Sequence, residues 1–175
     1  QADVLFVSRL GDELGRRGHT VAYAPRQQRL TLRDTRQTFE EEQLVIDHVS
    51  SAPETSLEEL LNKYGIDSPR GLVFPQMVYD YQYTNANHRR YLLGSPSVNY
   101  EPYLRTLHRV LDTFDRIYED GTGPIPIQHQ GAEVLRRALQ RVADTHGVKS
   151  VWVGNSPIDG HCGLHDDEFV NWETF

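Results

Sequence analysis

Hydrophobic positions recur every three or four residues in two stretches of the chain. Over residues 101–118 this spacing predicts a long amphipathic helix with one buried face. Over residues 132–145 it predicts a second helix of the same kind. A third, shorter helix is expected at residues 57–64, because Ser56 and Glu59 have the spacing of a capping box.

Short apolar runs predict strands on either side of helical segments. Residues 2–8 have the pattern of a strand buried on both faces, and a helical pattern that stops at Gly18 follows them. A second strand is expected at residues 19–24. Two further strands are expected on either side of the second long helix, a short buried strand at 125–128 and another strand at 148–154. Two strand–helix–strand units of this kind predict a parallel sheet.

This order of elements predicts an α/β fold, specifically a Rossmann-like three-layer domain with a parallel sheet. The length of 175 residues is that of one domain. We therefore expect a single domain over residues 1–175, with a less regular insertion at about 26–100. The insertion contains a strand-like run at 44–46 and a tyrosine-rich stretch at 73–91, for which we expect irregular or helical structure.

Composition and charge narrow the class of protein. Hydrophobic residues make up 38% and charged residues 25%, which is typical of a chain that buries a core. A net charge of −7 argues against a nucleic-acid partner. The sequence shows neither a secretory signal nor an apolar run long enough to span a membrane, so we expect a cytoplasmic protein. Such a protein could still associate with a membrane peripherally.

The sequence also lacks the common nucleotide-binding motifs and the cysteines needed for an internal disulfide. It contains neither a GxGxxG nor a GxxxxGK[ST] motif, and we expect no cofactor. Cys162 is the only cysteine, which excludes an internal disulfide framework.

The first candidate site is the loop between the strand at 125–128 and the helix that follows it. Gly131 allows the backbone to approach a ligand closely, and the start of the helix offers unpaired amides. The polar side chains suited to bind the hydroxyls of a sugar are Gln128, His129, Gln130 and Glu133. The structural alternative is that Gly131 only relieves a tight turn and Glu133 caps the helix.

A second polar loop follows the strand at 148–154. Because parallel strands place their carboxyl ends at one edge of a sheet, we expect this loop and the first to form a crevice. Its candidate substrate-binding residues are Asn155, Ser156 and His161.

The other reactive or charged side chains near these loops are not expected to take part in a metal site or in catalysis. The histidine, cysteine and carboxylate residues within 161–168 match no zinc-binding spacing, so we expect no metal site. Cys162 is not expected to be a nucleophile, because a neighbouring histidine in sequence does not make a catalytic pair. Arg136 either pairs with Glu133 or faces solvent, and we expect it to face solvent.

Several short motifs resemble the N-terminal half of GT-B glycosyltransferases, especially those of capsular and surface polysaccharide assembly. The resemblance rests on the apolar run at 4–7, the helix-Gly-His-x-Val junction at 17–21 and the loop at 128–133 before an arginine-rich helix. It covers residues 3–25 and 101–160. The chain departs from the family at its first loop, which is shorter than in those enzymes.

The resemblance implies a Rossmann-like half that holds a saccharide acceptor and faces a second domain that binds a nucleotide-sugar donor. Because 175 residues cannot supply both domains, we expect the chain alone to be inactive. It further implies a cleft lined by Gln130, Gly131, Glu133, Asn155, Ser156 and His161. Glu133 or His129 is the candidate base for the acceptor hydroxyl, a role that a retaining mechanism does not need.

A different class of function is also compatible with the sequence. The chain can be a non-catalytic α/β module that binds a small ligand in the same crevice. Alternatively, such a module can bind a protein through the tyrosine-rich segment at 79–91.

Overall fold

The computed structural model describes residues 2–23, 44–45, 52–78, 100–121, 123–129, 133–155 and 162–165. The chain divides into two compact units, Gln1–Ser51 and Ala52–Phe175, and each contains both helices and strands. The predicted α/β class is therefore confirmed. The single domain expected over residues 1–175 stays a prediction.

The N-terminal unit begins with a helix, α1 (Ala2–Arg16), where we expected a strand at residues 2–8. That prediction is wrong, and so is the strand–helix–strand unit built on it. A short apolar run has no periodicity that separates a buried strand from a turn of helix. Here the run continues without a turn signal into the helical pattern of Leu10 and Leu14, so one helix includes both.

The end of α1 agrees with the prediction. Gly18 has a positive φ of 89°, and its amide donates to the carbonyl of Gly15 at 2.9 Å. The amide of His19 donates to the carbonyl of Leu14 at 3.1 Å. This pair of bonds is a Schellman motif, which requires the left-handed backbone that glycine adopts without strain.

Two short parallel strands follow α1. β1 (Ala22–Tyr23) pairs with β2 (Leu44–Val45), and Ala22 is opposite Leu44. β1 confirms residues 22–23 of the strand expected at 19–24, and β2 confirms residues 44–45 of the run expected at 44–46.

In the C-terminal unit, α3 (Leu57–Lys63) has the capping box predicted from its sequence. The Ser56 hydroxyl accepts a hydrogen bond from the Glu59 amide at 3.3 Å, and the Glu59 carboxylate accepts one from the Ser56 amide at 3.1 Å. Gly65 ends the helix in a second Schellman motif. A further helical segment at 70–78 confirms helical structure for the start of the tyrosine-rich stretch, whose residues 79–91 lie outside the described residues.

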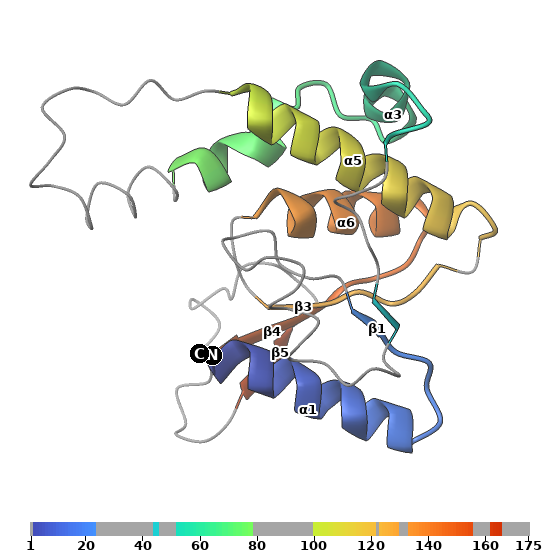
Figure 1. The fold of residues 1–175 in the computed structure, drawn as a ribbon, viewed down its shortest axis with the longest axis vertical. Coiled ribbons are helices and arrows are strands. Elements are labelled where there is room, and N and C mark those ends of the chain that lie inside the picture. The colour runs from blue at the N-terminus through green and yellow to red at the C-terminus, as the bar shows by residue number, and fades with distance from the viewer. Residues whose placement is uncertain are drawn as a thin grey trace, which may run out of the picture. The chain divides into compact units, whose positions relative to one another are not determined.

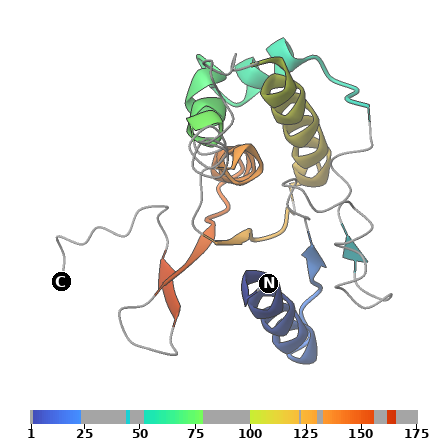
Figure 2. The same cartoon turned by 60° about the vertical axis from the view of Figure 1, so that its left-hand side comes forward.

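The two long helices agree closely with their predicted ranges. α5 (Glu101–Tyr118) and α6 (Val134–Thr145) run beside each other, and both views place α6 between α5 and the strands of this unit (Figures 1 and 2). Their fully buried apolar side chains are Leu107, Val110, Leu111, Phe114, Tyr118, Val134, Ala138, Val142 and Ala143. α6 ends like α1, because the amides of Gly147 and Val148 form the same two bonds as those of Gly18 and His19.

The sheet of this unit has the order β3-β4-β5, with β3 at Ile127–His129, β4 at Val151–Asn155 and β5 at Cys162–His165. β3 and β4 are parallel, which confirms the predicted strand–helix–strand unit around α6. β5 lies antiparallel to β4, in a segment where we expected only a loop. Residues 156–161 are too few for a parallel crossover, so the chain can return only antiparallel.

The two faces of this sheet differ in exposure. Gln128 and Trp152 are register partners on one face and are almost fully buried. On the other face Ile127 is 44% and Leu164 is 67% exposed, whereas Val153 is buried. The segment at 125–128 was expected to be buried, which is wrong for its isoleucines. No helix in the described parts of the chain is long and apolar enough to cross a membrane.

Candidate functional site

The carboxyl ends of β3 and β4 lie at the same edge of the sheet, as the parallel pairing requires. His129 is the last residue of β3 and Asn155 the last of β4, and Gln128 is the register partner of Trp152. Glu133 follows β3 and occupies the N-cap position of α6. We refer to these two strand ends and the start of α6 as the β3–β4 edge.

This edge brings together part of the predicted site. The backbone of His129 and Asn155 is described, whereas their side chains lie outside the described structure. The remaining candidates, Gln130, Gly131, Ser156 and His161, also lie outside it. Among the predicted site residues, the structure describes the side chains of Gln128 and Glu133.

Glu133 forms a largely buried ion pair at the start of α6. The distance from Arg136 Nε to Glu133 Oε2 is 3.1 Å, and the two side chains are 16% and 9% exposed. Because an unpaired buried charge is costly, the two side chains stabilise each other in this position. The expectation that Arg136 faces solvent is therefore wrong.

The sequence suggested either unpaired amides at the start of α6 or a cap from Glu133, and the structure shows neither arrangement at Val134. Glu133 has the extended backbone of an N-cap residue, but its side chain makes no capping hydrogen bond. Instead, the side chain of Gln76 accepts a hydrogen bond from the amide of Val134 at 2.8 Å. At least this amide of the first turn is therefore occupied by the protein itself.

Gln128 lies in the core rather than at the surface of the edge. It is 5% exposed, and its Nε2 donates to the hydroxyl of Ser150 at 3.4 Å. Its Oε1 has no hydrogen-bond partner among the described residues. This side chain is beside Trp152 on the covered face of the sheet, and its proposed contact with a substrate remains a prediction.

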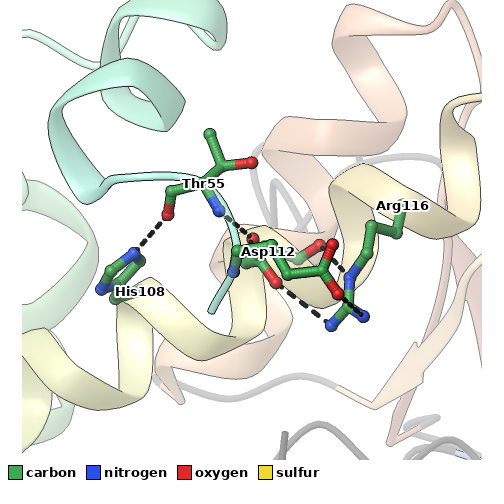
Figure 3. A network of polar contacts seen from close by, with 5 residues as sticks. Thr55, His108, Asp112 and Arg116 are labelled. Carbon is green, nitrogen blue, oxygen red and sulfur yellow. Dashed lines mark hydrogen bonds and ion pairs between the residues drawn. The ribbon is translucent and has the colours of Figure 1, made fainter. Parts of the chain in front are cut away.

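A second polar cluster lies between α5 and the segment that leads into α3 (Figure 3). Asp112 is 1% exposed, and its Oδ1 accepts hydrogen bonds from the amides of Glu54 and Thr55 at 3.0 and 2.9 Å. Its Oδ2 lies 3.1 Å from Arg116 Nη2. His108 donates from Nε2 to the carbonyl of Thr55 at 2.7 Å.

Both oxygens of Asp112 are thus engaged by the protein, so this carboxylate is not available as a base. The cluster instead holds the N-terminal approach to α3 against α5. This cluster was not predicted from the sequence, although one signal was present. His108, Asp112 and Arg116 are spaced by four residues, so they share one side of a helix.

A related cluster holds the other end of α3. The buried Tyr64 hydroxyl donates to Asp115, and Lys63 Nζ lies 2.6 Å from the same carboxylate oxygen. Burial, together with the hydrogen bond to Asp115, raises the pKa of Tyr64 well above its ordinary value. Tyr64 therefore stays protonated at physiological pH and is not a nucleophile.

Arg141 of α6 completes the contacts at this end of α3. It donates from Nε to the carbonyl of Tyr64 at 2.8 Å and from Nη2 to that of Gly65 at 2.7 Å. These bonds satisfy carbonyls that the end of a helix leaves free. The polar groups around α3 are thus explained by helix docking.

No group of three or more metal-ligating side chains lies close together among the residues that the structure describes. Comparisons of the chain with known protein families, with curated proteins and with solved structures find no match.

Proposed function

We propose that the chain is the acceptor-binding half of a GT-B glycosyltransferase with a Rossmann-like architecture, and that the β3–β4 edge binds a saccharide acceptor. The observation that carries the proposal is the parallel pairing of β3 and β4 around α6. In open α/β sheets, ligands bind beyond the carboxyl ends of such strands. The nucleotide-sugar donor would bind to a second domain outside these 175 residues.

The support comes from the C-terminal unit alone. The apolar run at 4–7 was one basis of the resemblance to GT-B enzymes, and it belongs to α1 rather than to a strand. The loop at 128–133 and the helix after it keep their place in the proposal, because β3, Glu133 and α6 follow one another as that resemblance requires.

Glu133 is the first candidate for the catalytic base. In the structure its Oε2 is paired with Arg136, so an acceptor hydroxyl would transfer its proton to a carboxylate that already contacts this guanidinium. His129 is the second candidate, because imidazole is the most frequent general base and His129 ends β3 at the same edge.

Saturation-transfer NMR tests the acceptor site. Maltose, lactose, diacetylchitobiose and glucuronic acid serve as acceptor probes, and uridine monophosphate serves as a probe for a donor-binding half. We expect saturation transfer to at least one sugar and its loss in Glu133→Gln. The control is Glu58→Gln, which changes an exposed carboxylate in the first turn of α3 and should leave sugar binding unchanged.

Two results would overturn the proposal. If uridine monophosphate binds and no sugar does, the chain is a donor-binding half. If neither binds, the acceptor assignment is refuted. The role of Glu133 as base is tested separately, by the transfer rate of the complete enzyme carrying Glu133→Gln, and an unchanged rate would exclude it.

The second candidate function is a protein-interaction module. It is favoured by two apolar side chains on one face of the sheet, Ile127 and Leu164, which are exposed. Large exposed apolar side chains that lie on one face mark interaction surfaces more often than scattered ones do. If neither the sugars nor uridine monophosphate bind, this second function is favoured.

A further inference from the structure

The start of α6 depends on a side chain from a distant part of the sequence. Gln76 and Val134 are separated by 58 positions, and the hydrogen bond between them is buried. Val134 is the first residue of α6 and is fully buried, so water cannot satisfy its amide. An amide in this position needs an acceptor from the protein, because a buried unpaired N–H is costly.

The usual source of that acceptor is the N-cap side chain, and here it is not used. Glu133 occupies the N-cap position, makes no capping bond and contacts Arg136 instead. The Oε1 of Gln76 takes over the role, since the amide nitrogen of the side chain can only donate. Gln76 therefore caps the first turn of α6 in place of Glu133, whose carboxylate pairs with Arg136.

Gln76 is itself buried. It is 8% exposed and lies on the buried side of the helical segment at 70–78, three residues after Val73 and next to Met77, which are both buried. A polar side chain on an otherwise apolar helix face is present for a hydrogen bond rather than for burial of surface. The segment at 70–78 thus contributes one directed polar contact to the candidate site.

We propose that Gln76 is a positioning residue, which sets the first turn of α6 and thereby the saccharide affinity of the β3–β4 edge. The second half of this inference rests on the proposed function. Its first half, that Gln76 holds the Val134 amide, is independent of any ligand.

Three variants of the chain separate the hydrogen bond from packing. Gln76→Met keeps the length of the side chain and removes the acceptor, whereas Gln76→Glu keeps an acceptor oxygen. Val73→Ala removes buried apolar volume from the same segment without touching the bond. Hydrogen exchange of the Val134 amide is measured relative to the Ala138 amide in the interior of α6, and sugar binding is measured with the probes named above.

We expect exchange at Val134 to be about tenfold faster in Gln76→Met, corresponding to the loss of one net hydrogen bond. Sugar binding should weaken in this variant, and Gln76→Glu should restore both properties. Val73→Ala should lower stability and leave the ratio of the two exchange rates unchanged.

Unchanged exchange at Val134 in Gln76→Met would overturn the inference. Faster exchange in Gln76→Met with unchanged sugar binding would show that Gln76 does not set the saccharide affinity of the β3–β4 edge. If the unmodified chain binds none of the sugars, the proposed function fails and the link to the site fails with it. The exchange ratio then still decides whether Gln76 holds the start of α6.

Discussion

The carboxylate of Asp112 accepts a hydrogen bond of 2.9 Å from the backbone amide of Thr55, which is 57 positions away in the sequence. The same oxygen also accepts a hydrogen bond from the amide of Glu54. One buried side chain therefore satisfies two backbone amides that precede α3. The capping box of α3 begins directly after these two amides. Asp112 therefore connects the start of α3 to the middle of α5.

Replacing Asp112 by alanine should lower the free energy of unfolding by about 2–4 kcal/mol, because two backbone amides lose a charged acceptor. Asp112→Asn should cost less, since it keeps an acceptor oxygen and loses the ion pair with Arg116. Urea unfolding followed by circular dichroism measures both. The control is Asp120→Asn at an exposed position after α5, and equal stability of this variant and Asp112→Ala would contradict the prediction.

Gly11 of α1 lies directly against the ring and hydroxyl of Tyr23. A methyl group at this position would overlap the tyrosine, so Gly11→Ala should destabilise the N-terminal unit by about 1–3 kcal/mol despite the better helix propensity of alanine. Gly15→Ala is the matched control on the same helix. Nothing lies within 4 Å of its added methyl group, so it should be neutral or stabilising.

Tyr23→Phe removes the hydroxyl that lies closest to the added methyl group of Gly11→Ala. The double variant should therefore recover part of the lost stability. Thermal unfolding of the single and double variants measures the coupling between the two positions. A Gly11→Ala chain as stable as Gly15→Ala would show that α1 does not pack on Tyr23 in this way.

Burial raises the pKa of Tyr118 to about 12 from the ordinary 10.0, which predicts a loss of stability at alkaline pH. The unfolded chain releases this proton near pH 10, whereas the folded chain retains it to about pH 12. The contribution to stability is therefore complete below pH 10 and disappears as the pH rises to about 12.

Urea unfolding at several pH values across this range, with Tyr118→Phe for comparison, measures the effect. The variant loses the hydrogen bond from Tyr118 to the Pro124 carbonyl, so its stability should be lower at neutral pH. Its free energy of unfolding should nevertheless fall less steeply with pH. Parallel curves for the two proteins would contradict the assignment of the titration to Tyr118.

The sequence predicted those elements whose signals are local. The capping box at Ser56 and the glycines at 18, 65 and 147 identify helix ends, because the residues that form each motif are neighbours in the chain. The buried face of α5 was predictable for the same reason. The strand at 2–8 was not, because a short apolar run is compatible with either structure.

The candidate site was only partly predictable. Parallel strands around α6 brought His129 and Asn155 to one edge, as their order in the sequence indicates. The partner of the Val134 amide was missed, because Gln76 belongs to a separate helical segment and no motif connects the two. The sequence allows Arg136 either to pair with Glu133 or to face solvent, and the burial of the pair is a property of the packed structure.

The sequence by itself determined where most helices begin and end, because caps and apolar periodicity act within a few residues. Only the tertiary structure decided which buried polar groups meet. Helix packing brings Asp112 to Thr55 and Gln76 to Val134. Each pair then forms a hydrogen bond, because a buried polar group without a partner costs free energy.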